Sequence, residues 1–131
     1  DEQRIKNEIQ KTEDIINEAI GIKTNLFRFP SGAFNESAVN IVEGLGYIPI
    51  HWSSDSVDWK NTSLDIEYNR VLKSIEQGGI MLFHNNGKYT AQNLDKLIPK
   101  LKSDGYNFVK VGELIYNNNY IIDENGIQRN K

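Results

Sequence analysis

The chain contains no cysteine, which excludes disulfide bonds and thiolate metal sites. Histidine is scarce as well, and His51 and His84 are the only imidazoles that could bind a metal. No apolar run approaches the roughly 20 residues of a membrane-spanning helix, and the charged start at Asp1 is not that of a signal peptide. The lysines form no basic stripe, and 18 acidic against 15 basic residues give a net charge of −3, so we expect no nucleic-acid partner.

The length allows one modest hydrophobic core. The 131 residues suffice for a single domain, but they are fewer than the roughly 250 residues of a complete α/β barrel. We therefore expect the chain to be part of a larger unit, with any export signal upstream of it.

Four amphipathic helices are predicted from apolar residues at helical spacing. The first covers residues 2–20, where Ile5, Ile9, Ile16 and Ile20 share a face and Gly21 ends the helix. Polar capping residues and following glycines delimit the other three, which are expected from Asn35 to Gly46, from Thr62 or Ser63 to Gly78, and from Thr90 to Asp104.

Short apolar runs between these helices predict strands. The first strand begins at Leu26, and the other three are expected over Gly46–Ser53, Gly79–Phe83 and Tyr106–Val111. Pro49 lacks a backbone donor, so it should distort its strand. Strands alternating with amphipathic helices predict an α/β fold whose parallel strands form a sheet or barrel.

Polar residues follow three of these strands. Arg28 ends the first strand, Asp55 and Asp58 follow the second, and His84 follows the third. Because the carboxyl ends of parallel strands lie at one edge, where ligands bind, Arg28, Asp58 and His84 should share a cleft.

Taken in their order along the chain, the segments around Arg28, Asp58 and His84 resemble motifs of the polysaccharide deacetylases of the NodB homology type, carbohydrate esterase family 4. Arg28-Phe29-Pro30-Ser31-Gly32 is similar to the family's Arg-x-Pro motif. Asp55-Ser56-Val57-Asp58-Trp59 matches its Asp-x-x-Asp-Trp motif, and Leu82-Phe83-His84 matches Leu-x-His. The resemblance implies part of a distorted (β/α) barrel.

Two family motifs, Thr-Phe-Asp-Asp-Gly and His-x-x-x-His, are missing from the sequence. In the family they supply the catalytic base and the metal ligands. We therefore expect residues 1–116 to be the carboxyl-terminal portion of such a domain and residues 117–131 a polar terminal tail. A divalent metal, zinc by resemblance, is expected only in the complete domain, with its ligands upstream of Asp1, and this chain alone should be inactive.

The resemblance also implies a role for each matching residue. Arg28 would pair with the missing base, and the backbone N–H of Ser31 would complete an oxyanion hole. His84 would be the general acid, oriented by Asp58, while Trp59 and Leu82 would form the acetyl pocket. The reaction would remove N-acetyl groups from an aminosugar polymer, peptidoglycan or chitin-like, outside the cell or in the bacterial cell wall.

Other interpretations of the same residues remain open. Arg28 and His84 could be structural, Trp59 and Leu82 could belong to the core, and Asp55 could cap a turn; for His51 we favour a structural role. A serine esterase using Ser31, Asp58 and His84 is another possibility, but the sequence around Ser31 lacks the Gly-x-Ser-x-Gly elbow that exposes such a nucleophile. A third possibility is a non-catalytic glycan-binding protein or inactive remnant.

Overall fold

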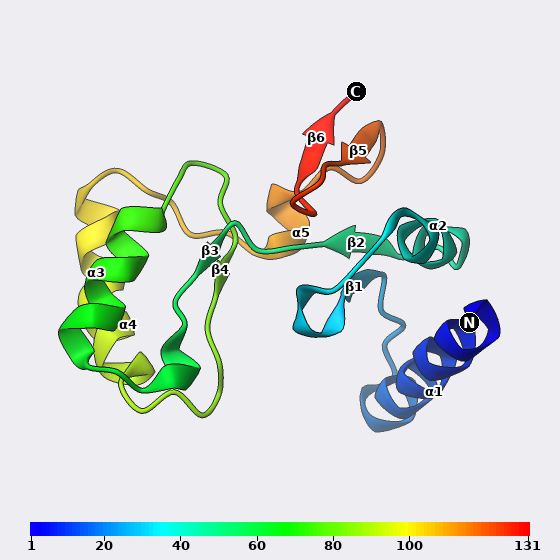
Figure 1. Ribbon diagram of the computed structural model, residues 1–131, viewed down its shortest axis with the longest axis horizontal. Helices are drawn as coiled ribbons and strands as arrows, with labels where there is room; N and C mark the ends of the chain where they lie inside the picture. The colour runs from blue at the N-terminus through cyan, green and yellow to red at the C-terminus, as the bar shows by residue number, and fades with distance from the viewer. The chain divides into compact units, whose positions relative to one another are not determined.

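Pairs of parallel strands connected through a helix occur twice in the structure, a computed structural model that describes residues 1–131 (Figure 1). β1 (Leu26–Arg28) pairs with β2 (Ile48–Ile50), and β3 (Ser54–Asp55) pairs with β4 (Met81–Leu82). α2 (Glu36–Gly44) separates the first pair along the sequence and α3 (Leu64–Ser74) the second. The predicted parallel α/β pattern is confirmed.

The two pairs belong to separate compact units. One unit contains residues 1–51 and 116–131, and the other contains residues 52–115. None of the helices in either unit is long and apolar enough to cross a membrane.

The first unit is built on α1 (Glu2–Ile20), which begins and ends as predicted. The helix ends at Gly21, whose φ of 67° is a left-handed conformation that glycine adopts at little cost. The Asn35 side chain caps α2 by accepting a 2.8 Å hydrogen bond from the Ala38 N–H. The apolar core of this unit joins Ile9, Phe29, Val39 and Val42.

Residues of the polar tail form an antiparallel hairpin in the same unit. β5 (Tyr120–Ile122) pairs with β6 (Gln128–Asn130), and Ile122 packs against the core of the unit. Burial is the largest cause, and a hydrogen bond to Glu43 the second, that raises the pKa of Tyr120 to about 12. The hairpin therefore shares apolar packing with the helices of this unit.

A buried carboxylate ties α1 to the strands of the first unit. Glu13 accepts hydrogen bonds from the Thr24 N–H at 2.8 Å, from the Tyr47 hydroxyl at 2.9 Å and from the Thr24 hydroxyl. The Thr24 hydroxyl is the main cause that holds the pKa of Glu13 below its ordinary value. The carboxylate thereby fixes the connection between α1 and β1.

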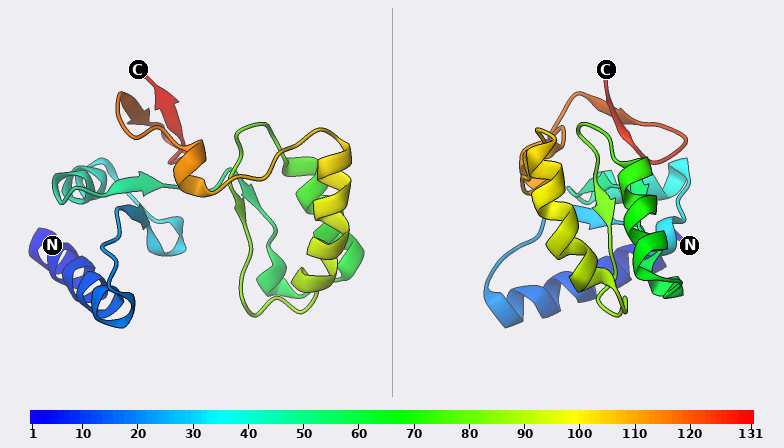
Figure 2. Two further views of the ribbon diagram at one scale, coloured as in Figure 1. Left: turned by 180° about the vertical axis from the view of Figure 1, so that it is seen from behind. Right: turned by 90° about the vertical axis from the view of Figure 1, so that its left-hand side faces the viewer.

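In the second unit α3 and α4 (Thr90–Ser103) lie side by side (Figures 1 and 2). Ser63, one of the two predicted caps, accepts a 3.2 Å bond from the Ile66 N–H at the start of α3. Val71 on α3 and Leu97 and Leu101 on α4 are almost fully buried. A hydrogen bond of 2.9 Å from the Asn93 amide to Glu67 also links the two helices.

Three of the predicted strands differ from the structure. The run Gly46–Ser53 forms a strand only over Ile48–Ile50, and Gly79–Phe83 only over Met81–Leu82. Tyr106–Val111 is not a strand, and α5 (Val111–Leu114) begins at its last residue. The expected neighbour, β4, pairs with β3 alone, so the backbone groups of Tyr106–Val111 have no strand partner. Phe108 and Val109 in this segment are exposed.

Candidate active site

Asp58 lies in a tight turn that directly follows β3. It begins the short 3₁₀ helix η2 (Asp58–Lys60), and the residues that flank this helix, Val57 and Asn61, have φ values of 53° and 49°. A left-handed conformation is unusual for a β-branched residue and costs on the order of 1–3 kcal/mol. Asp55 stabilises the turn because its Oδ1 accepts a 2.8 Å bond from the Val57 N–H, as the turn-cap interpretation predicted.

The Asp58 side chain is fully buried and receives three hydrogen bonds. Its Oδ1 lies 2.7 Å from Nδ1 of His84. Its Oδ2 accepts from the His84 backbone N–H at 2.8 Å and from the Thr90 hydroxyl at 2.7 Å. The structure therefore joins Asp58 and His84, which are 26 residues apart in the sequence.

Opposing effects act on the Asp58 carboxyl group. Burial raises the pKa of Asp58, but the hydrogen bonds from the His84 N–H, the Thr90 hydroxyl and the His84 ring favour the ionised form and hold this pKa below its ordinary value. An ionised carboxylate can only accept hydrogen bonds, so Nδ1 of His84 carries the proton that the two share. The other ring nitrogen, Nε2, takes no part in this pair, and the His84 side chain is 34% exposed.

The loop from His84 to Thr90 closes tightly over Asp58. A Cβ atom at Gly87 would lie 2.0 Å from Oγ1 of Thr90 and 2.7 Å from Oδ2 of Asp58. The Lys88 N–H donates to Oδ1 of Asn61 at 2.7 Å, which ties this loop to the end of η2. Glycine at position 87 is therefore required by the close approach of the loop to the buried carboxylate.

Trp59 and Leu82 differ in exposure. Trp59 is 52% exposed, with the Lys60 ammonium 5.2 Å from its ring centroid, so Trp59 is not a core residue. Leu82 is half-buried in β4, where it pairs with Asp55. A partly exposed indole and a half-buried leucine can both offer apolar surface to a ligand.

Arg28 and Ser31 lie in the first unit. Arg28 is the last residue of β1, and Ser31 lies in the 3₁₀ turn η1 (Pro30–Gly32) with a φ of 56°. The N–H groups of Gly32 and Ala33 close this turn at 3.0 and 3.2 Å. These bonds do not use the Ser31 N–H, which is the donor proposed for an oxyanion.

His51 also lies in the first unit, in an apolar setting. Its ring centroid is 5.8 Å from that of Phe34, and the turn of the β5–β6 hairpin approaches it closely at Gly126. These contacts fit the structural role favoured for His51.

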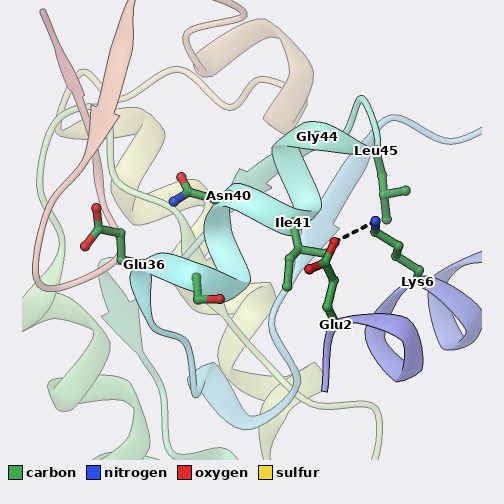
Figure 3. A pocket seen from close by; sticks show the side chains of 8 residues that line it. Glu2, Lys6, Glu36, Asn40, Ile41, Gly44 and Leu45 are labelled. Atoms are coloured by element: carbon green, nitrogen blue, oxygen red, sulfur yellow. Dashed lines mark ion pairs between the residues drawn. The ribbon is translucent and has the colours of Figure 1, made fainter.

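A hollow between α1 and α2 has a different character (Figure 3). It is lined largely by polar residues, and an ion pair of 2.6 Å joins Glu2 to Lys6 one turn later on α1. An ion pair of this kind on an exposed helix surface contributes little to stability, because water screens the two charges. The hollow contains none of the predicted site residues.

No group of three or more His, Cys, Asp or Glu side chains in the structure is arranged to hold a metal ion. The residues of this chain therefore do not fit the divalent metal that the resemblance implies for the complete domain.

Two residues of the site were not identified from the sequence. Thr90 was predicted to cap α4, whereas the helix has no side-chain cap and the Thr90 hydroxyl donates to Asp58. Gly87 carried no prediction of its own. The Asn86-Gly87 pair is a turn signal, but no local signal shows that the turn lies against a buried carboxylate.

Comparison with known proteins gives consistent relatives. The polysaccharide deacetylase family matches residues 1–50. The peptidoglycan-N-acetylglucosamine deacetylase PgdA of Listeria monocytogenes is 38% identical over 112 residues, which are 86% of this chain and 23% of that protein. A Bacillus cereus peptidoglycan-N-acetylglucosamine deacetylase is 37% identical over 69% of this chain and 45% of its own length.

Solved structures agree with these sequence relatives. A carbohydrate esterase family 4 pseudoenzyme from Bacillus anthracis superposes with a TM-score of 0.81 at 34% identity, over 87% of this chain and 40% of that one. A peptidoglycan N-acetylglucosamine deacetylase solved with an N-oxidanyl-benzamide ligand gives a TM-score of 0.82 at 33% identity, over 87% and 55% of the two chains.

The chain spans less than half the length of the curated relatives described above. The similarity nevertheless covers most of this chain, from α1 to the segments that carry Asp58 and His84. The chain therefore belongs to the polysaccharide deacetylase family, carbohydrate esterase family 4, and has part of the NodB-type (β/α) barrel fold.

Proposed function

We propose that this chain is the general-acid and pocket portion of a metal-dependent N-deacetylase acting on an acetylated aminosugar polymer. The observation that carries the proposal is the buried Asp58 carboxylate, which holds Nδ1 of a partly exposed histidine. The relatives named as peptidoglycan deacetylases favour peptidoglycan over a chitin-like chain. A protein with this substrate would work at the cell wall.

Hydrolysis of an amide requires a proton for the departing amine. In the proposed reaction the C–N bond breaks, and the amine nitrogen takes the proton from Nε2 of a His84 imidazolium, which becomes a neutral imidazole. The oxygen of a water molecule would add to the acetyl carbon and give its proton to the base of the complete domain, so that the acetyl group is released as acetate. Asp58 stabilises the protonated ring before transfer and keeps Nε2 directed toward the substrate.

The remaining residues would act on other parts of the substrate or on the missing base. The Ser31 N–H would donate to the oxyanion of the tetrahedral intermediate, and Arg28 would form an ion pair with the catalytic-base aspartate of the complete domain. Trp59 and Leu82 would contact the acetyl methyl group. The divalent metal, for which we propose zinc, would be held by residues outside this chain.

An apolar groove in the first unit is the observation that favours an additional segment of the same domain packing there. It runs between α1 and β1, with its apolar lining formed by Ile5, Ile9, Ile16, Leu26, Phe27 and Phe29. β1 pairs with β2 alone, so its other edge has no strand partner in the structure. We propose that an upstream strand of the complete domain pairs with this edge and covers the groove.

The experiment is His84→Ala in the complete protein, with two substrates compared. If His84 protonates the amine, turnover of an N-acetyl aminosugar oligomer should drop about 10²- to 10⁴-fold with little change in KM. An aryl acetate should lose far less, because its leaving group departs as an anion. Equal losses on both substrates, in protein shown to be folded, would remove the general-acid role.

A second candidate function is a non-catalytic member of the family. The Bacillus anthracis relative is described as a pseudoenzyme, and a mutant of it as having restored enzymatic activity. Binding of a chitooligosaccharide without acetate release, in the complete protein supplied with zinc, would favour this alternative. Labelling of Ser31 by a fluorophosphonate would instead support the serine esterase interpretation.

A further inference from the structure

We propose that Thr90 is a positioning residue for His84, because its hydroxyl group fixes the Asp58 carboxylate in the orientation that holds Nδ1 of the imidazole. The inference deepens the function proposed above and rests on it for its catalytic meaning. Its structural content concerns only hydrogen bonds within residues 52–115 of this chain.

The contacts divide the work between the two oxygens of Asp58. Oδ2 is held by the Thr90 hydroxyl at 2.7 Å and by the His84 N–H at 2.8 Å. Oδ1 is then left to face the His84 ring, 2.7 Å from Nδ1. Without the hydroxyl, a single backbone donor would hold Oδ2, and the carboxylate could rotate away from the ring.

The position of Thr90 in its helix is a second observation. α4 begins at Thr90, and the preceding residue, Tyr89, makes no side-chain cap. A side chain at the N-cap position usually satisfies a backbone N–H of its helix, but Thr90 is the first residue inside α4. Here the hydroxyl is directed to the carboxylate of another element, and Thr90 is buried.

The loop before α4 is shaped to permit this contact. A side chain at position 87 would occupy the space between Thr90 Oγ1 and Asp58 Oδ2, since its Cβ would lie within 2.7 Å of both atoms. The lack of a side chain at Gly87 therefore leaves room for the hydrogen bond. A hydroxyl that merely filled space would not require this clearance.

The orientation of the Asp58 carboxylate determines which ring nitrogen of His84 exchanges a proton with the substrate. A carboxylate held against Nδ1 keeps the proton on that nitrogen, so that Nε2 is the atom that gains and loses a proton during the reaction. Thr90 touches neither substrate nor reacting atom and acts through Asp58.

The test is ¹⁵N nuclear magnetic resonance of the 131-residue chain, which contains only two histidines, so that His51 serves as an internal reference. When the ring is neutral, wild-type His84 should carry its proton on Nδ1, with slow exchange of that proton. In Thr90→Val the exchange should be at least about tenfold faster and the Nε2–H tautomer should appear, because a hydrogen bond to a charged group has been lost.

Thr90→Ser keeps the hydroxyl and should keep the wild-type tautomer and exchange rate. Thr12→Val is the matched control, since the Thr12 hydroxyl donates only to the Glu8 carbonyl within α1. If Thr90→Val does not fold, Thr90→Ala is compared with Thr90→Ser instead. An exchange rate within twofold of wild type in the variants that lack the hydroxyl would overturn the inference.

These measurements are independent of deacetylation. A change in the His84 tautomer in Thr90→Val together with full N-acetyl hydrolysis by His84→Ala would leave the Thr90 assignment standing and remove the proposed function. The opposite pair of results would remove the Thr90 assignment alone.

Discussion

Replacing Gly87 with alanine should destabilise the protein, although glycine-to-alanine changes in many loops are neutral or stabilising. The added Cβ would lie 2.0 Å from Thr90 Oγ1, 2.7 Å from Asp58 Oδ2 and 3.0 Å from Asp58 Cγ. Ordinary contacts between such atoms are near 3.5 Å. Neither neighbour can move aside without losing a hydrogen bond, because Thr90 and Asp58 are buried and bonded to each other at 2.7 Å.

Two opposing terms set the size of the effect. Overpacking a buried site costs about 1–3 kcal/mol, while the reduced freedom of the unfolded chain returns about 0.4–1 kcal/mol. Because the clash involves buried polar atoms, we expect the upper part of this range, with a net loss of about 2 kcal/mol in the free energy of unfolding. For a chain of this size that loss lowers Tm by roughly 6–10 °C.

Thermal and urea unfolding followed by circular dichroism measure this change. Gly112→Ala on α5 is the matched control in the same unit, because no atom lies within 4 Å of the added Cβ. Its expected effect is a gain of about 0.5–1 kcal/mol, since alanine favours the helix. If Gly87→Ala were as stable as wild type, the close approach of the loop to Asp58 would be refuted.

Other perturbations test the remaining contacts. The pKa of Asp58 is lowered by folding, so its ionised form contributes stability above the ordinary carboxyl pKa of about 4, and this contribution is lost as the pH falls through the lowered value. As the pH is lowered from 5 to 2, the free energy of unfolding measured with urea should therefore decrease less in Asp58→Asn than in wild type. The same decrease in both proteins would contradict this. Glu13→Gln should lower Tm more than Glu8→Gln on the exposed surface of α1, because only Glu13 bonds Thr24 and Tyr47. The chain by itself should bind no catalytic zinc, and a tight stoichiometric zinc in calorimetry would contradict this prediction.

The sequence by itself determined the elements whose signals are local. The spacing of isoleucines with a final Gly21 defined α1, and Asn35 defined the start of α2 through a bond to a residue three positions away. Such signals act within a few residues of chain, so they can be read without knowing the fold. The short motifs around Asp58 and His84 were found for the same reason.

Only the tertiary structure decided how distant residues share their hydrogen bonds. A threonine before a helical pattern reads as a cap, yet Thr90 donates to a carboxylate 32 residues earlier. Tyr106–Val111 reads as a strand, but strand formation requires a partner backbone, and β4 is paired with β3 alone. The physical reason is that a hydroxyl or a backbone N–H can be satisfied in several ways, and long-range packing selects among them.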